Sequence, residues 1–131
     1  MEDKRTEKRK TGDLGEKLCV HFLKKHGFKV LDRNYLKPWG EIDIVTIKDN
    51  CLHFIEVKTV NKSKPEWGSS NGYEAEDNVH EWKLKRLGRT IETYLLEKNI
   101  PENQEYQLDV AVVYLDIEAG EGKVRFIPDV G

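Results

Sequence analysis

The sequence contains little cysteine, no long apolar run and almost no net charge. Its two cysteines, Cys19 and Cys51, are too few for a disulfide framework, and each lies in an apolar stretch where a reduced thiol packs like a small hydrophobe. The four histidines are scattered, and none stands at zinc-ligand spacing from a cysteine. We therefore expect reduced cysteines and no structural metal held by His or Cys.

No stretch of the sequence approaches the length of a membrane span, and the charged residues 1–10 lack the apolar core of a signal peptide. We therefore expect a soluble, cytoplasmic protein that does not enter membranes. The formal net charge is −2, so the chain as a whole does not resemble a nucleic-acid binder, and any such site must come from a local patch.

The length of 131 residues suits one compact domain. Residues 1–10, in which basic side chains outnumber acidic ones, are expected to form a flexible charged N-terminal arm. Residues 11–131 are expected to form a single domain, with no internal repeat.

A first helix is expected over about residues 13–26. Asp13 and Glu16 fit a capping box at its start, and Gly27 fits a left-handed stop at its end. Glu16 falls on the apolar side of this helix. That position is unusual for an acid, because a buried carboxylate needs a partner or a metal.

The remaining periodic segments predict five strands and a second helix. The strands are expected at residues 28–34, 41–48, 52–60, 107–117 and 124–127. A polar loop over 61–78, expected to be mobile and to border the site, leads to a helix that ends near Lys98. The order αβββαββ predicts an α/β fold with a mixed central sheet flanked by helices.

The second and third strands carry the residues with chemical potential. Counting back from a two-residue hairpin turn at 49–50, Asp43 lies directly opposite Glu56. Glu41 then lies opposite Lys58. Two opposed carboxylates repel each other and destabilise a sheet, unless a divalent cation turns the repulsion into a binding site.

Magnesium takes oxygen ligands, usually one or two carboxylates with water and substrate phosphate. Lys58, on the same face as Glu56, could orient or deprotonate the attacking water. These parts together serve metal-assisted phosphodiester hydrolysis. The alternative is an exposed sheet face with ordinary ion pairs, Glu41 with Lys58 among them, since Glu-x-Lys alone is a weak signal.

A set of short motifs in a fixed order strengthens the chemical reading. They are Thr11-Gly12-Asp13-Leu14-Gly15-Glu16, Gly27-Phe28, Asp32-Arg33-Asn34, Gly40-Glu41-Ile42-Asp43-Ile44-Val45, Phe54-Ile55-Glu56-Val57-Lys58, Lys83 with Arg86-Leu87, and Leu108-Asp109-Val110-Ala111-Val112. Together they cover most of the chain after residue 10. The set resembles the YraN-like family, small bacterial proteins predicted to be endonucleases.

The resemblance implies membership of the PD-(D/E)XK nuclease superfamily, with a restriction-endonuclease-like core shared with archaeal Holliday-junction resolvases. It implies that Asp43 and Glu56 bind Mg²⁺ or Mn²⁺. It further implies that Lys58 is catalytic and that Glu16 is the helical acid of the site. Ile42 stands where the superfamily has its proline.

Other residues are weaker candidates. Auxiliary or substrate-binding roles are assigned to Glu41, Lys83, Arg86, Trp67 and Tyr73. The two aromatic residues could stack on bases, although packing is the alternative. Asp109, among apolar residues, is expected to be a structural acid paired with Arg33 or Lys58.

Three functions are consistent with these observations. The favoured one is a metal-dependent endonuclease acting on DNA, with branched or damaged DNA as candidate substrates and a homodimer as a candidate state. The second is a non-catalytic nucleic-acid-binding protein on a nuclease fold. The third is a partner-binding protein whose acid cluster is only structural.

Overall fold

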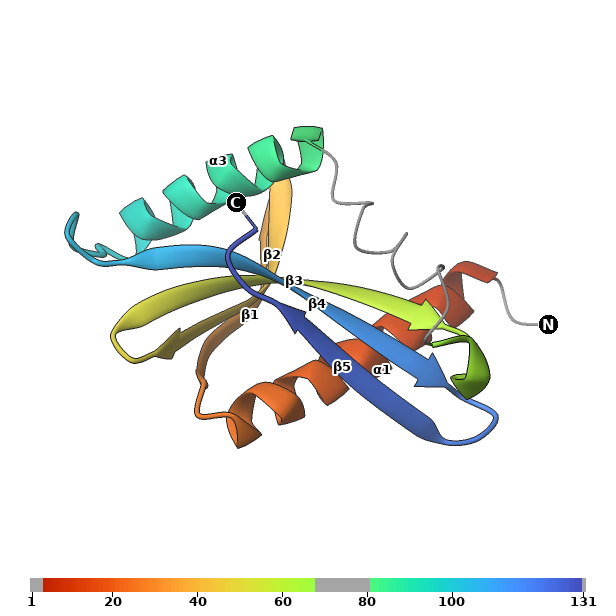
Figure 1. Cartoon of the computed structure of the whole chain (residues 1–131). Coiled ribbons are helices and arrows are strands. Elements are labelled where there is room, and N and C mark those ends of the chain that lie inside the picture. The colour runs from red at the N-terminus through yellow and green to blue at the C-terminus, as the bar shows by residue number, and fades with distance from the viewer. Residues whose placement is uncertain (1–3, 68–80, 131) are drawn as a thin grey trace.

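Five strands form one mixed sheet between two helices (Figure 1). The computed structural model describes residues 4–67 and 81–130, and for residues 4–5 and 81–85 the backbone alone. The elements are α1 Lys4–Lys25, β1 Lys29–Lys37, β2 Gly40–Lys48, β3 Cys51–Asn61, the short 3₁₀ helix η1 Lys64–Glu66, α3 Glu81–Glu97, β4 Tyr106–Asp116 and β5 Glu121–Ile127.

The strands stand in the order β1-β2-β3-β4-β5. β3 and β4 run parallel, and every other neighbouring pair is antiparallel. The predicted order of elements and the mixed sheet are confirmed. The arrangement is consistent with a restriction-endonuclease-like core.

α1 is longer than predicted, because it begins at Lys4 instead of near Asp13. Residues 4–10, expected to be an arm, form roughly the first two turns of the helix. The segment is rich in Lys, Arg and Glu, which favour helix, and the Thr11 hydroxyl donates to the carbonyl of Glu7 at 2.9 Å. Asp13 is therefore an interior residue of α1 and not its cap.

Turn residues with positive φ delimit the first elements. Gly27 ends α1 with φ of 85°, as predicted. Asp49 and Asn50 have φ of 50° and 62°, which suits the two-residue hairpin turn between β2 and β3. Lys48 pairs with Cys51 across that turn, so the predicted register is confirmed at this end of the hairpin.

The two helices cover opposite faces of the sheet (Figure 1). On the α1 side the apolar core contains Cys19, Val20, Leu23, Phe28, Ile44, Ile55, Ala111, Val113 and Leu115. On the α3 side it contains Ile42, Val45, Leu52, Phe54, Leu87, Ile91, Tyr94 and Leu108. Both cysteines are free, and no helix of the described residues is long and apolar enough to cross a bilayer.

Asp109 is a fully buried structural acid, as predicted, but the predicted partners are wrong. Its carboxylate contacts the His53 ring nitrogen Nδ1 at 2.6 Å and accepts hydrogen bonds from Gln107 and from the backbone N–H of Asp129. The register explains the choice: Asp109 pairs with Ile55, so His53 shares its face while Lys58 alternates to the other.

Candidate active site

Asp43 lies where β2 departs from a regular strand. On a regular strand Ile42 and Ile44 would share a face. Here Ile42 packs in the core on the α3 side, whereas Ile44 packs in the core on the α1 side. The backbone is therefore twisted at Asp43, between the two layers of the molecule.

The pairing of β2 with β3 ends at the same place. The last backbone pair is Ile44 with Ile55. At the next residue of β2, the side chain of Asp43 makes the contact with β3 in place of the backbone. Its Oδ2 atom accepts a hydrogen bond from the backbone N–H of Val57 at 2.8 Å. Asp43 and Glu56, which were predicted to lie opposite each other, are thus the first two residues beyond the paired part of the hairpin.

Four acids influence one another around Asp43. The pKa of Asp43 is raised to about 8, first by burial and then by the charge of Glu56, against the lowering effect of the Val57 N–H. Glu41 and Glu16 add smaller upward contributions. The pKa of Glu41 is itself raised by burial and then by Glu16 and Glu56. In the protein alone, Asp43 therefore retains a proton at neutral pH.

Glu16 is held by an arginine that the sequence analysis did not assign to the site. Both Nε and Nη2 of Arg33, on β1, lie 3.1 Å from Oε1 of Glu16. The Glu16 side chain is only 12% exposed, so this ion pair answers the question raised by an acid on the apolar side of α1. The position of Glu16 on the apolar side of α1 indicated that it needs a partner. The sequence analysis did not connect Arg33 with Glu16, because it proposed Arg33 as a partner of Asp109.

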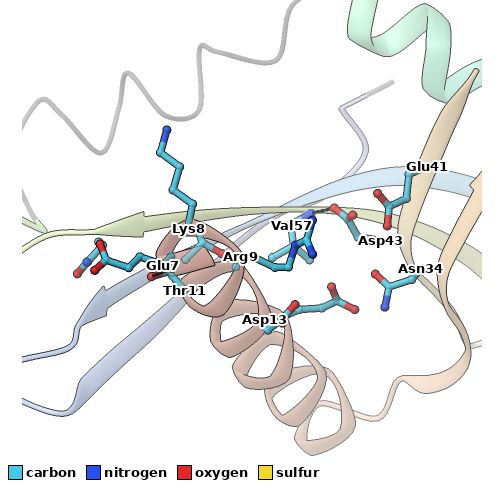
Figure 2. Close-up of a pocket in the computed structure, with 13 residues that line it drawn as sticks. Glu7, Lys8, Arg9, Thr11, Asp13, Asn34, Glu41, Asp43 and Val57 are labelled. Carbon is cyan, nitrogen blue, oxygen red and sulfur yellow. Dashed lines mark hydrogen bonds between the residues drawn. The ribbon is translucent and has the colours of Figure 1, made fainter. Parts of the chain in front are cut away.

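A cleft of about 930 Å³ opens between α1 and the sheet (Figure 2). Glu16 and the N-terminal turns of α1 form one wall. Asn34 of β1 and the acids Glu41 and Asp43 of β2 point into the cleft from the other side. Its remaining lining residues come from β3, namely Val57, Thr59 and Asn61.

The structure brings Glu16, Glu41 and Asp43 together in the cleft, and Glu56 acts on Asp43 electrostatically. Lys58 is not among the cleft-lining residues. It is half-buried on β3, and strand alternation places it with Glu56, on the face away from Val57. Across residues 4–67 and 81–130, no three Asp, Glu, His or Cys side chains are gathered into a complete metal-ligand set.

The auxiliary candidates lie apart from the cleft or outside the described residues. Arg86 donates from Nε to the carbonyl of Trp39 at 3.1 Å and so contacts the β1–β2 turn. Trp67 packs against Tyr114 and donates its ring N–H to the backbone carbonyl of Lys62 at 2.9 Å, which favours packing over base contact. The Lys83 side chain, Tyr73 and most of the 61–78 loop lie outside the described residues.

Sequence reasoning also missed Asn34. It has a φ of 53°, a left-handed conformation that asparagine tolerates better than most residues. Its side chain reaches the cleft from β1. The one available signal was its place in the Asp32-Arg33-Asn34 motif, which indicated importance without indicating position.

Comparison with known proteins gives a consistent assignment. A family model described as "Uncharacterised protein family UPF0102" matches residues 15–113. A UPF0102 protein of Campylobacter jejuni is 39% identical over 106 residues, which are 81% of this chain and 85% of the relative. One of Campylobacter concisus is 42% identical over 103 residues, 78% of this chain and 81% of the relative. One of Campylobacter hominis is 33% identical over 121 residues, 92% of this chain and 93% of the relative.

Proposed function

This chain belongs to the uncharacterised protein family UPF0102, and we propose that it is a metal-dependent endonuclease that hydrolyses phosphodiester bonds in DNA. The observation that carries the proposal is Asp43. Its carboxylate lies in a cleft with a pKa raised to about 8, beside three further acids. Such a group is costly in a protein that does not use it.

A divalent cation would remove that cost. Asp43 and Glu56 would hold it, with Glu16 approaching from α1. Because the described residues form no complete ligand set, water and a substrate phosphate would supply the other ligands, as is usual for Mg²⁺. A bound Mg²⁺ or Mn²⁺ would lower the pKa of a water molecule and offset the charge that develops on the phosphate.

The protein's own residues would do the rest. Lys58 follows Glu56 by two residues on the same strand face, so a phosphate that reaches Glu56 also comes within reach of the Lys58 ammonium. We assign to Lys58 the orientation of the attacking water and the stabilisation of charge in the transition state. Glu41 is assigned an auxiliary role at the rim of the cleft.

We further assign the protein to a superfamily, a compartment and a substrate class. It places the chain in the PD-(D/E)XK superfamily, related to the archaeal Holliday-junction resolvases, and in the cytoplasm. Branched or damaged DNA would be the substrate. A homodimer would bring two clefts to the two strands of a duplex, and light scattering tests that state.

The test is a cleavage assay on single-stranded, duplex, flapped and four-way DNA with Mg²⁺, Mn²⁺ or a chelator. We expect cleavage with either metal and none with the chelator. Asp43→Asn should abolish metal binding in calorimetry. Lys58→Ala should retain metal binding and lose about 10²–10⁴-fold in cleavage rate.

Two controls match these variants in chemistry. Asp49→Asn changes an acid in the hairpin turn, at a φ that Asn accepts, and Lys29→Ala removes an exposed lysine of β1. Both should cleave like the wild type. If calorimetry detects no divalent-metal binding by the wild type, even with DNA present, the nuclease proposal is wrong.

A further inference from the structure

One side of α1 carries a stripe of three residues that face the cleft. Arg9, Gly12 and Glu16 stand at i, i+3 and i+7, a spacing that places them along one side of a helix. All three line the cleft. In Figure 2 Arg9 extends from α1 into the cleft.

The packing of the described residues does not explain Gly12. A Cβ added there would meet nothing within 4 Å, whereas a Cβ at Gly15 would overlap the Thr59 side chain. A glycine inside a helix is unfavourable relative to alanine, so Gly12 weakens α1 without serving a contact within residues 4–67 and 81–130. What it does provide is bare helix backbone on the wall of the cleft, where another backbone can approach closely.

Arg9 supplies a cation on the α1 wall of the cleft. It makes no ion pair with any residue in the described parts of the chain. Seven residues separate it from Glu16, which corresponds to about 10 Å along the helix axis. One strand of DNA advances about 3.4 Å per nucleotide along a duplex axis, so this separation spans roughly three nucleotides.

We propose that the Arg9–Gly12–Glu16 side of α1 is the track along which the sugar-phosphate backbone of a DNA strand lies. Arg9 binds a phosphate roughly three nucleotides from the one nearest Glu16, and Gly12 lets the strand pass against the helix. The identity of the ligand rests on the proposed function. Because Arg9 and Gly12 are proposed to bind DNA and not to cut it, their roles can be tested by measuring DNA binding alone.

The first test measures DNA binding by fluorescence anisotropy in a chelator, with labelled single-stranded and duplex DNA at several salt concentrations. Arg9→Gln should weaken binding about tenfold and reduce the slope of log affinity against log salt by about one. Lys17→Gln is the matched control, since it removes the same charge from an exposed site on α1 outside the cleft lining. Equal losses for the two variants, or no binding by the wild type, would overturn the track.

The second test uses two glycines. Gly12 and Gly88 are both interior residues of long helices, and a Cβ at either would meet nothing within 4 Å. Gly12→Ala and Gly88→Ala should therefore both raise Tm. Only Gly12→Ala should weaken DNA binding, by several-fold. If it binds DNA as tightly as Gly88→Ala does, the track is wrong.

A cleavage assay with Mg²⁺ separates the two proposals. Arg9→Gln should raise KM and leave both kcat and metal affinity unchanged, because Arg9 is not at the reacting phosphate. Loss of DNA binding in Arg9→Gln, with no cleavage by the wild type, would support the track and refute the nuclease. Wild-type cleavage with KM and affinity unchanged in Arg9→Gln would refute the track alone.

Discussion

The side chain of Asp43 accepts a hydrogen bond from the backbone N–H of Val57, in place of a backbone hydrogen bond between β2 and β3. The backbone N–H of Val57 lies 2.8 Å from Oδ2 of Asp43, just past the last backbone pair of the two strands. The same carboxylate thus closes the sheet and faces the cleft. Stability and the proposed chemistry are therefore linked through one residue.

The first prediction concerns pH. The pKa of Asp43 is about 8 in the folded protein against an ordinary value of 3.8, so between these values the folded protein holds a proton that the unfolded chain has lost. The free energy of unfolding should therefore fall as pH rises from about 4 to 8, by at most about 1.4 kcal/mol per unit for this group.

Asp43→Asn removes this titration but keeps an oxygen that can accept from Val57. In urea denaturation with a chelator, the variant should equal the wild type near pH 5 and exceed it by about 1–3 kcal/mol at pH 8. Asp49→Asn should follow the wild-type pH profile. Parallel profiles for Asp43→Asn and the wild type would show that Asp43 is ionised throughout.

The second prediction concerns the ion pair between Arg33 and Glu16. Arg33→Gln leaves a mostly buried carboxylate without its two guanidinium contacts and should cost about 1–2 kcal/mol in the free energy of unfolding. Adding Glu16→Gln should recover most of that loss, because the unpaired charge is gone. A double variant no more stable than Arg33→Gln would mean that Arg33 contributes through packing alone.

The third prediction concerns the contact between α1 and β3. Gly15→Ala places a Cβ inside the volume of the Thr59 side chain and should destabilise the protein by about 1–3 kcal/mol. Thr59→Ala removes the two nearest atoms and should restore part of the loss in the double variant. Thermal unfolding of the three variants measures this coupling, and additive effects would count against the contact.

The fourth prediction concerns the buried cluster at Asp109. Asp109→Ala leaves His53, Gln107 and the N–H of Asp129 without their common acceptor and should cost about 3 kcal/mol or more. His53→Ala and Asp109→Ala combined should cost less than the sum of the two single changes. Urea midpoints for the three variants measure this difference.

Periodicity and turn chemistry predicted most of the fold. Apolar patterning and turn residues identified all five strands, and Asp49-Asn50 fixed the register of the central hairpin, because both residues accept positive φ. The start of α1 was predicted wrongly because Asp13 and Glu16 resemble a capping box. In the structure α1 continues through these positions, so the preference of Asp13 for a helix start does not decide where the helix begins.

The candidate site could be predicted only in part. Asp43 and Glu56 follow from hairpin counting, and Glu16 from an acid on an apolar helix face. Arg33 and Asn34 could not be placed, because their positions depend on how α1 crosses β1 and on a positive φ that sequence alone does not fix. Lys58 lies away from the cleft lining because side chains alternate along β3 and Val57 and Thr59 are the ones that line the cleft. The sequence does not show which face of β3 borders the site, because Asp43 lies where the alternation of β2 is broken.

The parallel pairing of β3 with β4 has a consequence for how the protein is made. Every proposed catalytic residue precedes Asn61, yet β3 gains its second neighbour only when β4, from Tyr106 to Asp116, has left the ribosome. At about 5–20 residues per second this interval lasts on the order of 3–11 s. During it the nascent chain carries the whole acid cluster beside an apolar strand edge that β4 will later cover. A chain that stops before β4 would therefore contain every proposed catalytic residue and still lack the sheet that positions them.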